Sequence, residues 1–454
     1  MGFTNVVRLA VQFVSVPILA RFLSPEDYGL AAMAMPVILF LMTLADAGLA
    51  ASLVRSGPPD GPAWHTCFWL SGLFGTAAGL AVALVAPEAA SLLGQPRLTA
   101  ILLTLAAVLP LQSLTLVPGA ALQQGGRFGV IATTEITAMG SGVAVAVVLA
   151  NSGCGVWALV WQQVVFYSVR LVFTLARSSY RPKAIFDLHD ARDHLTFGRN
   201  LLGAALISFV SRSLENLVIG RVWGTGAVGV YAMAFQFARL PSMLVTGPLQ
   251  YVLYPHVAAI RGNEREWKIL FLFLTRLLAA GCLPAVALAA AASGPIFTGL
   301  LSEKWTPVAP IFVLVAPATA VQPVTALIGT FLMATGRTDV QFRLAARYAA
   351  LWLAGLLLAV GHGVGAVAAA YTLCVLFFTL WSLRISLPVI GCSFTAYGRC
   401  FLWPGTLTAA ALLVYHLAAP AAWWADIGLA AGLAIVAGGV ALALQRRALR
   451  DVTT

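Results

Sequence analysis

The chain has 454 residues, of which 60% are hydrophobic and 9% are charged, and its formal net charge is +11. Soluble domains carry roughly 25% charged residues, so this composition excludes a soluble globular protein and indicates an integral membrane protein. The basic residues are distributed along the chain and form no single patch, which argues against a nucleic-acid partner. The six cysteines and six histidines lack metal-ligand spacing, so we expect no metal site and no disulfide framework.

Apolar runs long enough to cross roughly 30 Å of hydrocarbon recur along the chain. The runs are continuous and do not alternate with polar residues, which predicts helices and not a membrane barrel. We expect about fourteen spans. They are placed at 5–23, 29–54, 64–86, 99–121, 130–150, 154–176, 201–222, 229–256, 269–292, 308–334, 345–361, 364–386, 400–419 and 425–444.

The first polar break, "SPEDYG" from Ser24, holds two acids between apolar runs. A membrane enzyme could use Glu26 and Asp27 as catalytic carboxylates on the outer face. A helix start explains the same letters, with Ser24 at the N-cap, Pro25 at the first helical position and Asp27 at the third. We favour the helix start, and the catalytic reading remains as the alternative.

The segments between spans alternate in charge. One side holds Arg127, Arg177, Arg265, Arg337 and most other basic residues, while the other holds little beyond Arg97 and Lys304. Positive charge accumulates on the cytoplasmic side, so both termini are expected there and residues 24–28 are expected outside.

The longest break, residues 177–200, is also predicted to be cytoplasmic. Phe186, Leu188 and Leu195 stand among charged residues, which favours a short amphipathic helix on the membrane surface.

The chain carries an internal duplication. "RFLSPEDYGLAAMA" from Arg21 aligns without gaps to "RVWGTGAVGVYAMA" from Arg221, so that Gly29 matches Gly229. Further along, in a shifted register, Gln112 precedes Gly126-Arg127 as Gln322 precedes Gly336-Arg337. The second copy lacks the acids of "SPEDYG", so those acids are not part of the shared machinery.

Each copy holds six spans, an even number, so both insert in the same orientation as a parallel repeat. The expected fold is all-α and membrane-integral, with two six-helix repeats and two further helices at the end. The expected regions are a first bundle at 1–176, a linker at 177–200, a second bundle at 201–386, and a helix pair with a cytoplasmic tail at 387–454.

Polar residues inside the spans are the candidates for a substrate path, because charges at mid-membrane usually face a water-filled route. On the seventh span, Ser208, Arg212, Glu215 and Asn216 share one helical face. The matched residues of the first span are Arg8, Gln12 and Ser15. A structural pairing of Arg212 with Glu215 is the alternative to a cavity lining. Further candidates are Asp46, Glu135, Arg170, Arg239 and Arg276.

The stretches "PILARFLSPEDYGLAAMA" and "DAGLAASLVR", with "LLSEKWTPVAPIF" and "FLMATGRTDVQFR" further on, resemble the Wzx-type polysaccharide flippases. These belong to the multidrug/oligosaccharidyl-lipid/polysaccharide exporter superfamily, and the resemblance covers nearly the whole chain. It implies a protein of the bacterial inner membrane that moves an undecaprenyl-diphosphate-linked oligosaccharide between leaflets. The product would be O-antigen, capsule or exopolysaccharide.

The resemblance also implies alternating access to a central cavity, no cofactor, and a proton or sodium gradient as the candidate for coupling. The expected partners are the lipid-linked substrate and membrane lipids, with a polymerase and export machinery as further candidates. Two other functions stay open. One is a drug or cation exporter of the same superfamily, and the other is a membrane glycosyltransferase or ligase using the same lipid carrier.

Overall fold

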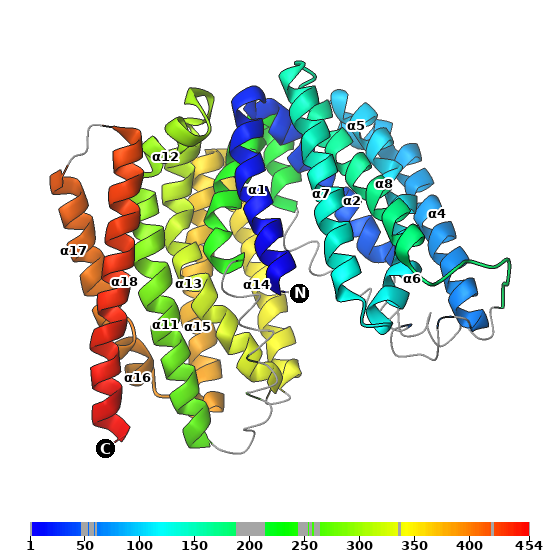
Figure 1. The fold of residues 1–454 in the computed structure, drawn as a ribbon. Helices are drawn as coiled ribbons and strands as arrows, with labels where there is room; N and C mark the ends of the chain where they lie inside the picture. Colours follow the sequence, from blue (N-terminus) through cyan, green and yellow to red (C-terminus); the bar gives the residue numbers. More distant parts are fainter. Residues whose placement is uncertain are drawn as a thin grey trace. The chain divides into compact units, whose positions relative to one another are not determined.

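The computed structural model describes residues 2–46, 53, 59, 61–187, 214–243, 253, 257, 264–334, 337–418 and 422–453. All regular elements within these residues are helices. The chain forms two compact units, residues Met1–Gly229 and Val230–Thr454. Each unit is a bundle of long helices (Figure 1).

The first unit begins with α1 (Gly2–Phe22) and α2 (Pro25–Asp46). It continues with α4 (Pro62–Leu92), α5 (Arg97–Ala106), α6 (Val108–Gln124), α7 (Phe128–Asn151) and α8 (Trp157–Arg177). The span predicted at 99–121 is divided between α5 and α6 at Ala107. Pro110 stands in the first turn of α6, where its missing N–H costs no helical hydrogen bond. The remaining long helix of this unit runs over Leu214–Ala238, and its part up to Gly229 belongs here.

The second unit contains α11 (Glu264–Ala291), α12 (Ser293–Leu300), a short 3-10 turn η1 (Glu303–Trp305) and α13 (Val308–Ala334). These are followed by α14 (Thr338–Ala359), a second 3-10 turn η2 (Val360–His362) and α15 (Val364–Ile390). The chain ends with α16 (Phe394–Arg399), α17 (Leu402–Ala418) and α18 (Trp423–Thr453). α17 and α18 lie at the positions of the two spans predicted at 400–419 and 425–444.

Twelve helices within the described residues are long and apolar enough to cross a membrane. The predicted all-α membrane fold is therefore confirmed, and α1 adds a further apolar helix at the position of the first predicted span. Of the spans predicted at 201–222 and 229–256, the structure describes residues 214–243 and 253, and the loop predicted at residues 223–228 is wrong. The helix runs through them over Leu214–Ala238, with Gly224 at a φ of +82°.

Of the predicted linker at 177–200, the structure describes residues 177–187. Residues 178–187, which include Phe186, are not helical. They lie along the start of α4 and are held by side-chain bonds. Tyr180 is 1% exposed and its hydroxyl lies 3.1 Å from Nδ1 of His65, while Trp69 Nε1 donates to the carbonyl of Lys183 at 2.9 Å. Burial raises the pKa of Tyr180. The rest of the expected amphipathic helix, with Leu188 and Leu195, lies outside the described residues.

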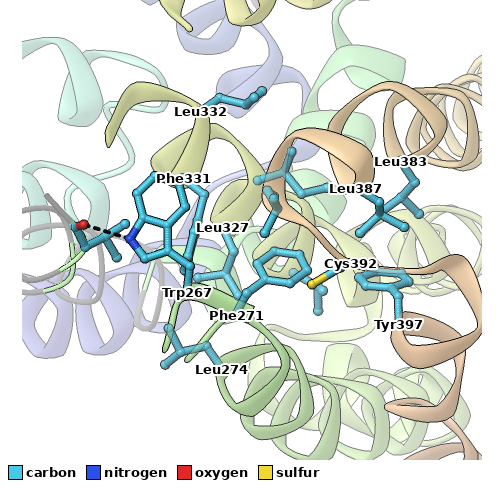
Figure 2. Packing of buried hydrophobic residues seen from close by; sticks show 14 of the residues in the cluster. Trp267, Phe271, Leu274, Leu327, Phe331, Leu332, Leu383, Leu387, Cys392 and Tyr397 are labelled. Atoms are coloured by element: carbon cyan, nitrogen blue, oxygen red, sulfur yellow. Dashed lines mark hydrogen bonds between the residues drawn. The ribbon is translucent and has the colours of Figure 1, made fainter. Parts of the chain in front are cut away.

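The core of the second unit is aromatic where α11, α13 and α16 meet (Figure 2). Phe271 and Phe331 are fully buried, and their rings meet edge to face with centroids 5.2 Å apart. Trp267 lies edge-on to Phe331 at 6.2 Å and donates its indole N–H to the carbonyl of Val257. Such edge-to-face pairs add specific geometry to the packing of large side chains. The core fixes the start of α11 against the end of α13.

The two halves of the duplication share local backbone geometry. Arg127, before α7, has φ −79° and ψ 48°, and Arg337, before α14, has φ −87° and ψ 47°. The N–H of Arg127 donates to the carbonyl of Leu122 at 2.9 Å, and that of Arg337 donates to Leu332 at 3.0 Å. Arg127 and Arg337 therefore share the same backbone conformation and hydrogen bond directly before matching helices.

Candidate functional site

A polar cluster lies inside the first unit, where α6, α7 and α8 meet. Arg170 Nε on α8 lies 2.8 Å from Glu135 Oε1 on α7. Arg170 Nη1 donates to Gln112 Oε1 on α6 at 2.8 Å. The side chains of Arg170 and Glu135 are 28% and 27% exposed. The cluster is thus a half-buried ion pair supported by a neutral amide.

The sequence of α7 explains how the charged residues approach each other. Thr134, Ala138, Gly142, Ala146 and Ala150 recur at every fourth position and form the buried face of α7. Small side chains at this spacing allow neighbouring helix backbones to pack closely, a common arrangement in membranes. Glu135 follows directly after the first of them and meets α8 at the edge of this face.

The chemistry of the cluster suits an anionic ligand. A guanidinium group carries five N–H donors in a planar fork, and the bonds to Glu135 and Gln112 use two of them. The remaining donors match the oxygen atoms of a phosphate or diphosphate. Glu135 balances the charge of Arg170, which reduces the cost of holding an arginine inside a membrane bundle.

The structure brings together two of the predicted site residues, Glu135 and Arg170, within the described part of the chain. Asp46 is half-buried at the end of α2. Arg239 is exposed, with its guanidinium carbon 5.6 Å from the ring centre of Phe235. Arg276 is half-buried on α11, close to the thiol of Cys400.

The polar stripe predicted on the seventh span is visible only in part. Ser208 and Arg212 lie outside the described residues, as do the side chains of Arg8 and Gln12 on α1. Glu215 is 5% exposed. Asn216 Nδ2 donates to the carbonyl of Ala32 on α2 at 3.2 Å. Asn216 therefore joins two helices of the first unit, while the role expected for Arg212 stays a prediction.

The acids of the first polar break differ in their surroundings. Asp27 Oδ2 accepts hydrogen bonds from the backbone N–H and the hydroxyl of Ser24, and the Ser24 hydroxyl accepts from the N–H of Asp27. This reciprocal arrangement is a capping box, and it lies at the predicted helix start. Asp27 Oδ1 also accepts from the N–H of Val156 at 2.9 Å, directly before α8. Asp27 thus holds two helix starts, whereas Glu26 is exposed.

The matched glycines of the duplication meet in space. A Cβ atom built on Gly29 would overlap the carbonyl oxygen of Thr225, and one built on Gly229 would overlap that of Pro25. Each would also lie 3.1 Å from the backbone nitrogen of the other glycine. The contact is reciprocal, since Pro25 and Thr225 occupy matching positions of the two copies. Only glycine permits this close crossing of backbones.

Sequence reasoning missed several polar residues that the structure highlights. Gln112 was noted only as a marker of the duplication, although it completes the cluster around Arg170. Arg347 and Arg384 stand inside the apolar runs at 345–361 and 364–386, and an arginine within a predicted span was a usable signal.

The family of the chain follows from comparison with known sequences. The sequence profile of a family described as "Polysaccharide biosynthesis protein" matches residues 18–310, which is more than half of the chain. The chain belongs to this family. The resemblance drawn from the residues is therefore confirmed, and the protein is a multi-pass membrane protein of the polysaccharide biosynthesis family.

Two characterised relatives illustrate the similarity. The succinoglycan biosynthesis transport protein ExoT of Rhizobium meliloti (strain 1021) is 28% identical over 67% of this chain and 62% of its own length. The matched region thus covers less than two thirds of that protein. The lipopolysaccharide biosynthesis protein WzxC of Escherichia coli (strain K12) is 25% identical over 91% of this chain and 85% of its own length.

Solved structures of the same fold include two membrane transporters. The lipid II flippase MurJ, in an inward closed conformation, superposes with a TM-score of 0.76 at 14% identity, covering 100% of this chain and 98% of its own. An inward-facing multidrug resistance transporter of the MATE family, from the MOP superfamily, gives a TM-score of 0.67 at 16% identity over 85% of this chain and 99% of its own. At these identities the likeness establishes the fold.

Proposed function

We propose that the protein is a flippase for a lipid-linked oligosaccharide, carried on undecaprenyl diphosphate, in the bacterial inner membrane. The family match over residues 18–310 is the observation that carries this proposal. The fold shared with a lipid flippase and the transport functions named for the relatives support it. The translocated unit would serve the synthesis of O-antigen, capsule or exopolysaccharide.

In the proposed mechanism, the cluster of Arg170, Glu135 and Gln112 is the binding site for the diphosphate. In this mechanism the diphosphate enters the first unit and takes the N–H donors of Arg170 that neither Glu135 nor Gln112 occupies. An arginine binds two phosphate oxygens at once, so it fixes the orientation of the head group as well as its charge. Gln112 holds the guanidinium in place and supplies no charge that would repel the ligand.

The helices that cross at Gly29 and Gly229 are the elements that would move apart during transport. Alternating access requires one side of the substrate path to close while the other opens. The two backbones are in contact at the end of α2 that follows the polar break, which charge asymmetry assigns to the periplasm. We assign this crossing to the closed outer side, and its separation would release the sugar outwards.

The glycosyltransferase alternative depended on Glu26 and Asp27. Asp27 is engaged by Ser24 and Val156 at two helix starts, so its carboxylate has a structural task. The relative ExoT is a transport protein by name, which favours a transporter over an enzyme. We therefore place the protein among transporters, with polymerase and export machinery as later partners and a proton or sodium gradient as the coupling source.

A translocation assay tests the proposal. The purified full-length protein is placed in liposomes with a fluorescent undecaprenyl-diphosphate oligosaccharide, and the fraction protected from a membrane-impermeant quencher is followed over time. We expect fast exchange between leaflets with the protein and none in protein-free vesicles. A matched lipid with a single phosphate and the same sugar is the control for head-group selectivity. Exchange no faster than in protein-free vesicles would overturn the proposed function.

The orientation has a test of its own. Reporter fusions at the two termini and within residues 177–200 should give cytoplasmic signals, while fusions within residues 24–28 should give periplasmic ones. A periplasmic signal from the 177–200 segment would contradict the assigned sides.

A further inference from the structure

The outer face of α15 carries one charged residue in an apolar row. Leu373, Phe377 and Leu380 are 67%, 62% and 57% exposed, and they follow one another at helical spacing. A face of exposed Leu and Phe on a membrane-spanning helix is in contact with lipid acyl chains. Arg384 is exposed and continues the same row one turn further on. Its guanidinium therefore lies at the lipid-facing surface of the second unit.

A second arginine reaches the same surface from α14. The guanidinium carbon of Arg347 lies 5.1 Å from the ring centre of Trp381 on α15. Trp381 precedes Arg384 by a single turn of α15. Because α14 and α15 are consecutive antiparallel helices, Arg384 lies at about the level of Arg343, which is one turn before Arg347.

The charge of this surface is positive. Arg343, Arg347 and Arg384 contribute three positive charges, and Asp339 contributes one negative charge. Asp339 is already paired, since its Oδ2 lies 2.6 Å from Arg343 Nη2 and its Oδ1 lies 3.7 Å from Arg337 Nε. Neither Arg347 nor Arg384 takes part in the two ion pairs of Asp339.

The depth of the two arginines fits the phosphate layer of a bilayer. α15 has 27 residues, and at about 1.5 Å per residue it is long enough to cross the hydrocarbon core and reach both head-group regions. Arg384 stands about 9 Å from the end of α15, and Arg347 about 13 Å from the start of α14. Long arginine side chains extend from such positions toward the interface, while tryptophan rings favour the same layer.

We infer that Arg347, Arg384 and Trp381 form a binding site for the phosphate head group of an acidic phospholipid, with its acyl chains along Leu373, Phe377 and Leu380. The occupant is a bulk membrane lipid, and the inference does not depend on the proposed function. Arg343 adds a further positive charge at the rim. In the first unit, Arg177 lies over Phe173 at 5.0 Å and donates to the hydroxyl of Thr133, so its guanidinium is already engaged.

Native mass spectrometry of the full-length protein tests the site, with phosphatidylglycerol and phosphatidylcholine of identical chains as probes. The wild type should retain phosphatidylglycerol in preference to phosphatidylcholine. The double variant Arg347→Gln/Arg384→Gln should bind phosphatidylglycerol about tenfold more weakly, because two charge-assisted contacts to phosphate are lost. Its binding of phosphatidylcholine should not change.

The matched control is Arg265→Gln, which removes an exposed arginine from the first turn of α11. It should leave binding of both lipids as in the wild type. Gel filtration checks folding, and the single variant Arg384→Gln replaces the double variant if the latter aggregates. Equal retention of phosphatidylglycerol by variant and wild type would overturn the inference. Equal losses of phosphatidylglycerol in Arg265→Gln, or no preference of the wild type for phosphatidylglycerol over phosphatidylcholine, would also overturn it.

Discussion

The two halves of the duplication place matching glutamines at one position and use them differently. Gln112 in the first unit accepts a hydrogen bond from Arg170, which is paired with Glu135. Gln322 in the second unit donates its amide N–H to the hydroxyl of Tyr371.

The surroundings of Tyr371 are aromatic. Its ring lies edge-on to Phe235 at 4.8 Å and to Trp352 at 5.2 Å. The same backbone plan thus carries a charged interior in one copy and an aromatic interior in the other. On this difference we base the proposal that the first unit binds the anionic group of the substrate, while the second contributes aromatic packing.

The largest effect is expected at Gly29 and Gly229, the matching glycines whose backbones are in contact. Gly29→Val and Gly229→Val should each abolish transport, because any Cβ there overlaps a carbonyl oxygen of the facing helix. The matched control is Gly432→Val on α18, where a Cβ meets no atom within 4 Å. Polymer export in a strain lacking the chromosomal gene provides the measurement. Unequal outcomes for the two glycines would contradict their equivalence.

A second prediction separates the two glutamines. Gln112→Met should reduce transport about tenfold or more, because a hydrogen bond to a charged group contributes roughly 1.5–3 kcal/mol and here orients Arg170. Gln322→Met should lower thermal stability and leave transport per folded molecule near the wild-type rate. Translocation assays normalised to folded protein would check both. If the Gln322 variant loses transport while the Gln112 variant keeps it, the assignment of the two interiors is wrong.

A smaller effect is expected at the first polar break, which the second copy lacks. Asp27→Asn should destabilise the protein by about 1 kcal/mol, the usual cost of a weakened helix cap. Its bond to Val156 ties α2 to the start of α8, so the midpoint of thermal unfolding should fall. The exposed Glu26 gives the matched control, and Glu26→Gln should leave both the midpoint and export unchanged. Loss of export in Glu26→Gln with normal protein abundance would revive a catalytic role.

Local features of this chain were accessible from sequence, and features that depend on helix pairing were not. Ser24 and Asp27 are three residues apart, so their capping box follows from short-range geometry. Gln112 lies far from Arg170 in sequence, and their contact depends on which faces of α6 and α8 meet. Apolar helices have weak periodicity, so hydropathy indicates the spans but not their rotation.

The glycine pair shows an intermediate case. The alignment of Gly29 with Gly229 was visible in the sequence, since both stand before an Ala-Met-Ala segment. That their backbones touch required the structure, because a repeat in sequence does not say whether its copies meet. Asp27 is a similar case. Its bonds to Ser24 are local and could be predicted, whereas its bond to Val156 joins residues far apart in sequence and could not.

The central claim is that Arg170 binds the diphosphate of a lipid-linked saccharide, and one measurement tests it most directly. Binding of undecaprenyl-diphosphate oligosaccharide to the purified protein is compared for wild type, Arg170→Gln, Arg170→Lys and Tyr371→Phe. The account predicts that Arg170→Gln loses binding, that Arg170→Lys remains weak because a point charge does not reproduce a bidentate contact, and that Tyr371→Phe binds as the wild type does. Wild-type affinity in a folded Arg170→Gln variant would contradict it.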